Sequence, residues 1–259
     1  MNLNKLLRDN RDTPRALKAE AASNSTPTLY VYDAIASNDA DAEFGGGVSP
    51  QAFVTALNKL DAPEIHIRLN SPGGDAFGGR VMEGAIRAHP SRIIAHIDGY
   101  AASAASYVAL AADEVEIAPG GFFMVHNAWT IAIGNALDLL DRAALLEKID
   151  ATLVQTYAAR TGQDAAVIKT LMEAETWIDA ATSLELGFAD RIAEDGPKDW
   201  IAWDLSAYKN APAAAAPEPA APEPEPAAAA PEPEPAAAAE DLTEHRKRQL
   251  ELLRLRRIA

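Results

Sequence analysis

Short β-rich runs alternate with helical runs between residues 28 and 187 of this 259-residue chain, and this alternation limits the possible folds more than any other feature. When strands and helices follow one another in regular order, each helix returns the chain to the same end of the next strand. The pattern therefore predicts an α/β layered fold with a largely parallel sheet. The expected strands are 28–32, 64–69, 92–97, 114–117 and 122–126, and the expected helices are 51–60, 76–88, 101–112, 136–160, 164–174 and 180–186.

Local signals indicate where several of these helices begin and end. Ser49 followed by Pro50 is typical of a helix start, because serine caps the first free N–H groups and proline suits the first turn. Asp179 and Gly187 bracket the last expected helix as its cap and its end. The run 101–112 is small and apolar on nearly every face, which predicts a buried helix.

The C-terminal part of the chain has a different composition. Residues 211–240 are almost only Ala, Pro and Glu, and this predicts a semi-rigid linker, because dense proline blocks helix propagation and glutamates repel one another. The last 19 residues mix Arg and Lys with Leu and are a basic helix candidate, either a solvated tail or a segment that docks on an acidic capsid or scaffold surface. We therefore divide the chain into an N-terminal extension or propeptide (1–26), a main domain (27–207), a linker (208–240) and a C-terminal helix (241–259).

Charge and composition exclude several classes of protein. The chain has 23 Lys and Arg against 38 Asp and Glu, a formal net charge of −15, so its main body repels nucleic-acid phosphates. It has no cysteine, which excludes disulfides, thiolate zinc sites and a cysteine nucleophile. We see no secretion signal and no run of about 18 apolar residues, so we expect a soluble cytoplasmic protein. No HExxH pattern occurs, and nothing in the sequence points to a metal or an organic cofactor.

The first segment that suggests chemistry is NSPGGD, residues 70–75, directly after the expected strand 64–69. Two adjacent glycines, Gly73 and Gly74, free the backbone to present its N–H groups, which suits the stabilisation of an anion. The simpler interpretation is a tight connection between a strand and a helix. No GxxxxGK[ST] pattern occurs, so we do not expect a phosphate-binding P-loop.

Two further segments place a serine and a histidine near strand ends. Ser103 lies at the start of the small apolar helix, where helix-end N–H groups favour developing negative charge, so it is either a nucleophile or a packing and capping residue. Ser106 is a weaker candidate for the same role. His126 ends an apolar strand and is the best placed histidine for a site, with a structural role as the alternative. The other histidines are His66 and His96 inside expected strands, His89 before a proline and His245 in the basic tail.

Taken together, these segments resemble the Clp protease proteolytic subunit (ClpP) family, and more closely its phage branch, the head maturation or prohead proteases. The resemblance covers residues 28–192 and depends on four motifs in the right order: NSPGG, GYAASAAS, FMVHNA and ETWIDAATSLELGFAD. Each motif alone is weak. Their co-occurrence on an alternating α/β pattern makes the resemblance specific.

The resemblance implies a serine endopeptidase with Ser103 as nucleophile and His126 as general base, which takes the serine proton and returns it to the leaving amine. Gly74 and Ala104 would supply the backbone N–H groups of the oxyanion hole. This chemistry needs all of these groups, because a serine hydroxyl is a poor nucleophile without a base, and the tetrahedral oxyanion needs preorganised donors.

The sequence departs from the family pattern at the third member of the triad. Glu175 stands at the position of the family's aspartate, and it offers the same carboxylate one methylene further from the backbone. Asp179 is the alternative, although a helix cap is its other role. A site without an acidic third member is also left open.

The resemblance further implies a ClpP/crotonase-type fold of stacked strand and helix turns, with the helix 136–160 as an arm that interlocks subunits. Members of the family close into homo-oligomeric rings, usually of seven subunits. We therefore expect a heptamer-based ring that admits only unfolded or threaded protein and peptide substrates.

Partner identity separates the functional hypotheses. The preferred one is a phage head maturation protease in the bacterial host cytoplasm, which processes capsid or scaffold proteins inside an assembling procapsid without an ATPase. The alternative is an ATP-dependent Clp protease subunit that works with a Clp ATPase as its unfoldase. Two others are a crotonase-like acyl-CoA enzyme, which would leave the pairing of Ser103 and His126 unexplained, and an inactive ring-forming scaffold.

Overall fold

The computed structural model describes residues 3–10, 13, 16–20, 26–196 and 203–212. The chain forms two compact units, residues 1–216 and 217–259, and every described residue belongs to the first. The expected C-terminal helix and all but the first few residues of the expected linker therefore lie outside the described residues. In the part of the chain that is described, no helix is long and apolar enough to cross a lipid bilayer.

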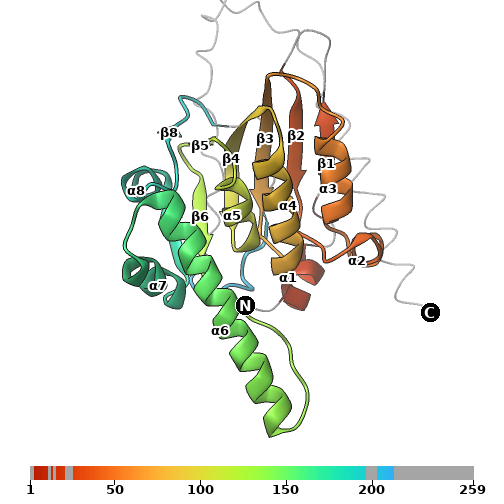
Figure 1. Cartoon of the computed structure of the whole chain (residues 1–259), viewed down its shortest axis with the longest axis vertical. Helices are drawn as coiled ribbons and strands as arrows, with labels where there is room; N and C mark the ends of the chain where they lie inside the picture. Colours follow the sequence, from red (N-terminus) through yellow and green to blue (C-terminus); the bar gives the residue numbers. More distant parts are fainter. Residues whose placement is uncertain (1–2, 11–12, 14–15, 21–25, 197–202, 213–259) are drawn as a thin grey trace, which may run out of the picture. The chain divides into compact units, whose positions relative to one another are not determined.

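An eight-stranded sheet forms the centre of the first unit (Figure 1). Along its main path, β1-β2-β3-β4-β5-β8, all neighbours are parallel except β1 and β2. β6 pairs in parallel with the end of β4, and β7 pairs antiparallel with β6. The expected α/β fold with a largely parallel sheet is confirmed. The strands are β1 (Ala16–Glu20), β2 (Thr28–Tyr32), β3 (Glu64–Ser71), β4 (Arg92–Ala102), β5 (Glu114–Ile117), β6 (Phe122–Val125), β7 (Thr176–Asp179) and β8 (Arg191–Ile192).

The helices begin where the sequence provides capping side chains. The Ser49 hydroxyl caps α3, and Pro50 occupies its first turn. Asp179 caps α8, and Gly187 ends that helix in a left-handed conformation, as predicted. The helices are α1 (Leu3–Asp9), α2 (Asp39–Gly45), α3 (Pro50–Leu57), α4 (Ala76–Ala88), α5 (Ala104–Ala109), α6 (Ala136–Thr161), α7 (Ala165–Glu173) and α8 (Ala180–Leu186).

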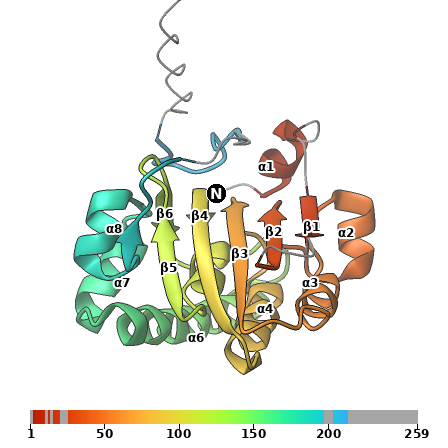
Figure 2. The same ribbon diagram turned by 90° about the horizontal axis from the view of Figure 1, so that it is seen from above.

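Different segments cover the two faces of the sheet (Figure 2). On one face, α3, α4 and α6 bury the main apolar core, to which Ile65 and Ile67 of β3 contribute. On the other face, α1 and residues 203–212 form a second cluster over the end of β4, in which Leu6 and Trp203 are buried. Parallel sheets are stable when both faces are covered, so both clusters stabilise the ends of β4 and β6.

The structure differs from the sequence prediction at the helix expected over residues 101–112. Ala101 and Ala102 continue β4, because they pair with β6, and α5 begins only at Ala104. The prediction was wrong for Ala101 and Ala102, because small apolar residues suit a buried strand as well as a buried helix. Pairing with a strand further along the chain decides between the two. Residues Ala104–Ala109 do form the expected buried helix.

The short elements α1, α2, β1, β7 and β8 were not predicted from the sequence. α1 and β1 lie in the expected N-terminal extension, where β1 adds an antiparallel edge strand to β2. β7 is four residues long and pairs along its whole length with β6. Such elements are stabilised by their neighbours in space, so local hydrophobic periodicity does not reveal them.

Candidate active site

Ser103 occupies the sharp turn between β4 and α5 in an unusual backbone conformation. Its φ and ψ are 51° and −121°, and it is one of two non-glycine residues with positive φ in the described residues. Its N–H donates to the Met124 carbonyl at 2.8 Å, which ties the turn to β6. L-residues rarely adopt positive φ, and such strain is found mainly at functional sites whose surroundings hold it in place.

The pairing of β4 with β6 brings His126 to Ser103. Ala102 stands opposite Met124 in this parallel pair, so the residues that follow the two strands leave the sheet side by side. The Nε2 atom of His126 lies 2.8 Å from the Ser103 hydroxyl oxygen. This is the distance of a hydrogen bond in which the serine donates to a neutral imidazole.

The surroundings of His126 favour the neutral form of its ring. Burial lowers the pKa of His126 to about 4, because a charged imidazolium loses the solvation that water would provide. At neutral pH the ring is therefore uncharged and able to accept a proton. A histidine that is to act as a general base needs this state.

The turn Pro72-Gly73-Gly74 after β3 packs directly against Ser103. Gly73 has φ 88° and Gly74 has φ 152°, which are backbone conformations that favour glycine. A Cβ atom on Gly73 would lie 2.8 Å from the Cβ of Ser103, so no side chain fits between the two segments. Hydrogen bonds from the Ile35 N–H to the Gly73 carbonyl and from the Asp75 N–H to the Ile35 carbonyl fix the backbone on both sides of Gly74.

Two backbone N–H groups next to Ser103 have no acceptor among the described residues. They belong to Gly74 and to Ala104, the first residue of α5. Both residues line the same cleft as Ser103 and His126. Preorganised N–H groups beside a serine hydroxyl are suited to an oxyanion that forms when the serine attacks a carbonyl.

A cleft of about 420 Å³ lies over these groups. Its walls are largely apolar, with Asp75 and Arg142 as charged groups in the lining. Apolar walls around a few converging polar groups are typical of a substrate site. The lining residues from α6 and the loop before it are Ala128, Trp129, Thr130, Ile131, Arg142, Leu145, Leu146, Ile149, Leu153 and Tyr157.

Comparison with known proteins identifies the family. The family model described as Clp protease matches residues 47–196, more than half of the chain, and this range contains Ser103, His126 and both glycines of the turn. The chain belongs to the Clp protease family. The resemblance seen in the four motifs is thereby confirmed, and the α/β fold described above is the fold of this family.

Several curated relatives of this Clp-family chain are named as subunits of the ATP-dependent Clp protease. Proteolytic subunit 1 of Protochlamydia amoebophila is 29% identical over 179 residues, which cover 68% of this chain and 84% of the relative. Proteolytic subunit 1 of Chlamydia muridarum is 31% identical over 166 residues, 58% of this chain and 83% of the relative. Proteolytic subunit 2 of Treponema denticola is 29% identical over 133 residues, 51% of this chain and 66% of the relative. These similarities show the family but not its phage branch.

Neither acidic candidate for the third member bonds to His126 among the described residues of this Clp-family site. Glu175 follows α7 with a positive φ of 51°, and its carboxylate accepts a hydrogen bond of 2.8 Å from the Asn210 N–H. Asp179 caps α8, and the hydrogen bond from the Thr182 N–H lowers the pKa of Asp179. The identity of the third member therefore stays a prediction.

Ser106 is buried and has a structural environment. Its hydroxyl donates to the Ser103 carbonyl at 2.6 Å and lies 2.7 Å from the Tyr157 hydroxyl. These contacts tie the first turn of α5 to α6. Ser106 thus supports the turn that presents Ser103.

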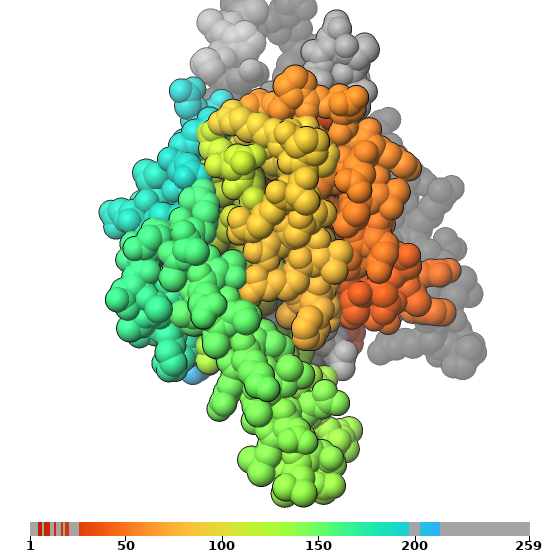
Figure 3. Space-filling view, viewed as in Figure 1, coloured from red at the N-terminus to blue at the C-terminus, as the bar shows by residue number. Residues whose placement is uncertain are grey.

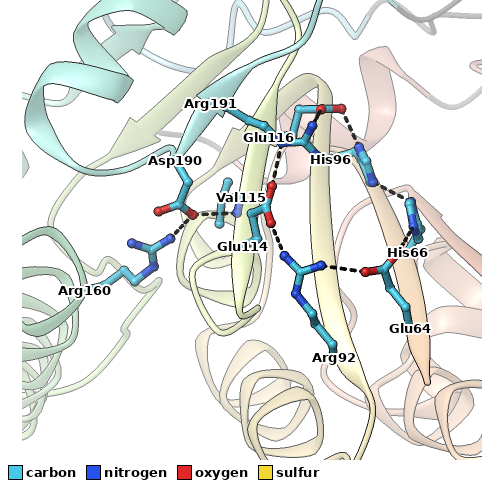
Figure 4. Close-up of polar contacts among 10 residues, drawn as sticks. All are labelled: Glu64, His66, Arg92, His96, Glu114, Val115, Glu116, Arg160, Asp190 and Arg191. Carbon is cyan, nitrogen blue, oxygen red and sulfur yellow. Dashed lines mark hydrogen bonds and ion pairs between the residues drawn. The ribbon is translucent and has the colours of Figure 1, made fainter. Parts of the chain in front are cut away.

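His66 and His96 belong to a polar network on the sheet (Figure 4). Their rings stack 4.7 Å apart, and His96 also bonds to Glu116 at 2.7 Å. Arginines of β4 and β8 bridge the neighbouring glutamates of β3 and β5, so the network joins four strands. His89 accepts a hydrogen bond from a backbone N–H in its own loop, and His245 lies outside the described residues.

The structure also brings to the site a residue that the sequence analysis assigned to the linker. Tyr208 is 4% exposed, and its ring stands edge-on to that of His126 with the ring centres 5.9 Å apart. The available signal was the spacing of Trp203, Leu205 and Tyr208 just before the Ala/Pro/Glu tract. Large apolar and aromatic side chains are usually buried, so their presence here indicates packing against a core and not a solvent-exposed linker.

Proposed function

We propose that this protein is a serine endopeptidase, which hydrolyses peptide bonds through an acyl-enzyme intermediate. The observation that carries the proposal is the 2.8 Å hydrogen bond between the Ser103 hydroxyl and Nε2 of His126, at the base of an apolar cleft. Membership of the Clp protease family supports the same reaction class.

In the first half of the reaction, the Ser103 oxygen attacks the carbonyl carbon of the scissile peptide bond while His126 accepts the serine proton. The resulting oxyanion receives hydrogen bonds from the N–H groups of Gly74 and Ala104. When the C–N bond breaks, His126 returns the proton to the leaving amine, and an ester to Ser103 remains. Water then repeats the sequence, with His126 as its base, and releases the acid product and free Ser103.

The low pKa of His126 has a consequence for this cycle. It keeps the base neutral in the resting state, but the imidazolium that forms during attack is then costly in a poorly solvated site. In most serine triads a carboxylate on Nδ1 offsets this cost. For Glu175 to take this role, its carboxylate would have to release the Asn210 N–H and accept a hydrogen bond from Nδ1 of His126.

Fluorophosphonate labelling tests the proposed reaction, because the probe reacts only with an activated serine. We expect the wild-type protein to gain the mass of one probe and Ser103→Ala to gain none, as followed by intact mass spectrometry. Ser91→Ala changes a serine just before β4, at the opposite end of that strand from Ser103, so it serves as the matched control and should label like wild type. A wild-type protein that stays unlabelled and does not cleave an unfolded substrate would contradict the proposal.

Two hypotheses on the substrate and the partner of this protein have different support. Processing of capsid or scaffold proteins by a phage head maturation protease remains our hypothesis from the motifs and the C-terminal composition. The relatives described above carry the name of ATP-dependent subunits, and this favours the alternative in which a Clp ATPase feeds unfolded chains to Ser103. Degradation of a folded reporter only when a Clp ATPase and ATP are added would select the alternative, whereas cleavage of assembled coat or scaffold protein without ATPase would select the first hypothesis.

A further inference from the structure

The residues 203–212, called here the 203–212 segment, lie beyond the part of the chain that matches the Clp protease family. They nevertheless belong to the folded unit, since Trp203, Leu205 and Tyr208 are buried in the second core cluster. Asn10 at the end of α1 anchors the segment, because its side chain donates to the Asp204 carbonyl at 2.9 Å and accepts from the Asp204 N–H at 2.6 Å. The segment thus lies outside the matched range and is held on the sheet face opposite α4 and α6 (Figure 2).

Tyr208 connects this segment to two parts of the active site. Its hydroxyl donates a hydrogen bond to the Pro72 carbonyl, at the start of the turn that presents the Gly74 N–H. Its ring stands at 89° to the ring of His126, with the centres 5.9 Å apart, and at 83° to the ring of Trp177, with the centres 5.6 Å apart. Burial raises the pKa of Tyr208, so the hydroxyl keeps the proton that it donates.

The same segment also contacts Glu175, the first candidate for the acidic third member of the triad. The Asn210 N–H donates to the Glu175 carboxylate at 2.8 Å, and the Asn210 side chain donates to the Ala174 carbonyl at 2.8 Å. Among the described residues, no carboxylate bonds to His126. The ring of Tyr208 provides a contact between the 203–212 segment and His126.

A histidine base needs such a restraint. The rotation of an imidazole about its last side-chain bond has broad minima, so its Nε2 stays aimed at a serine only when neighbours hold the ring. In most triads a carboxylate on Nδ1 provides this orientation. An aromatic ring set edge-on can restrict the same rotation, and in addition it keeps water from that side of the imidazole.

We propose that Tyr208 is a positioning residue of this active site, which holds His126 in the orientation that accepts the Ser103 proton and anchors the turn that presents Gly74. The inference rests on the proposed peptidase function. In other triads an acidic residue orients the histidine. Here an aromatic side chain from outside the range that matches the family would take that role.

The proposal predicts that the loss of Tyr208 lowers kcat and leaves KM unchanged. Tyr208 is not among the described residues that line the cleft, so its loss should leave KM close to the wild-type value. Tyr208→Leu should lower kcat by about 10-fold to 100-fold, the size of effect that follows from small misplacement of a catalytic group. Tyr208→Phe keeps the ring and loses only the hydroxyl, so it should lower kcat by less. Tyr30→Leu removes a half-buried tyrosine of β2 and is the matched control.

A readout that does not require activity is the pKa of His126 itself. In a Ser103→Ala background with isotope-labelled histidine, NMR titration should show that Tyr208→Leu raises the pKa of His126 towards the ordinary value of about 6.5, because water gains access to the ring. Tyr208→Phe and Tyr30→Leu should leave it low. Leu205→Ala weakens the packing of the same segment but keeps the Tyr208 ring, so it should also leave the pKa of His126 low.

The results of these experiments distinguish failure of the inference from failure of the proposed function. Wild-type labelling by fluorophosphonate, together with Tyr208 variants that keep kcat and the pKa of His126 unchanged, would overturn the inference and leave the peptidase intact. A Leu205→Ala variant that shifts the pKa as far as Tyr208→Leu would also overturn it, since the segment as a whole and not Tyr208 would be responsible. A fall of kcat in Glu175→Gln as large as that in Ser103→Ala would give the orienting role to Glu175. If wild type is not labelled, the proposed function fails first, and the inference fails with it.

Discussion

At the scale of single residues, the chemistry depends on two side chains whose properties are set by their surroundings. Ser103 is held at positive φ because its N–H is tied to β6 and its carbonyl accepts the Ser106 hydroxyl. His126 receives its low pKa from burial and not from a charged partner among the described residues. The site therefore combines a strained nucleophile with a base that stays neutral in mildly acidic solution.

This low pKa predicts an unusual pH dependence. The reaction needs neutral His126, so activity is lost as the pH falls through the pKa of the ring, and a lowered pKa extends the active range to more acidic solution. We expect the acid limb of the kcat/KM profile, which reports the free enzyme, to lie near pH 4 instead of near the ordinary histidine value of about 6.5. The measurement uses an uncharged fluorogenic peptide, with tryptophan fluorescence as the control for acid unfolding. A limb near pH 6.5 would contradict the low pKa.

At the scale of elements, catalysis depends on three segments that meet at one edge of the sheet. The turn after β3, the turn between β4 and α5, and the end of β6 are neighbours because β3, β4 and β6 run in parallel. The turn after β3 has room for backbone only, since a Cβ on Gly73 would meet the Ala102 carbonyl oxygen at 2.5 Å. The close approach brings the turn that contains Gly74 against Ser103, and both residues line the same cleft.

Gly73→Ala should therefore damage the site more than the fold. The new methyl group must push the turn away from Ser103, and a misplaced oxyanion donor typically costs about 10²-fold to 10³-fold in kcat. The unfavourable positive φ should also lower the free energy of unfolding by about 1–3 kcal/mol. Gly84→Ala is the matched control, because its Cβ would point into open space on α4, where alanine stabilises a helix by up to about 1 kcal/mol. Equal kcat in both variants would show that the turn does not carry an oxyanion donor.

At the scale of the whole molecule, α6 has two different halves. Leu153 and Tyr157 in its second half are buried in the main core, whereas its first half extends away from the sheet (Figures 1 and 3). Leu137 is 71% exposed and Leu140 64% exposed, and Ile133 in the preceding loop is 97% exposed. Large apolar side chains gathered on one projection indicate a surface that another protein covers, and this supports the proposed assembly of subunits into a ring.

Charge on this projection should prevent assembly without unfolding the subunit. We expect wild type to sediment as an oligomer and the double variant Leu137→Asp, Leu140→Asp to sediment as a monomer of 27.5 kDa, because burial of each leucine contributes about 1.5–3 kcal/mol to the contact. Val167→Asp, at an exposed position of α7, is the control and should leave the oligomer intact. Wild type that sediments as a monomer would remove the ring proposal.

The parts of this protein that could be predicted from sequence are those that depend on neighbours along the chain. The alternation of runs gave the parallel α/β fold, and the caps at Ser49 and Asp179 lie where their side chains indicated. The bounds of α4 and α8 agree with the expected ranges, since hydrophobic periodicity and capping act within a few turns. Ser103 and His126 were singled out by motifs at strand ends, and the structure brings them within hydrogen-bond distance.

Contacts between distant segments were decided only by the tertiary structure. The pairing of Ala101 and Ala102 with β6, the hydrogen bond of Glu175 to Asn210 and the packing of Tyr208 against His126 all join residues that are far apart in sequence. These contacts form because they bury surface that the two segments share. The packing partner of a short apolar run or of a single tyrosine is not set by its own sequence. It depends on which surfaces the assembled sheet and helices leave exposed.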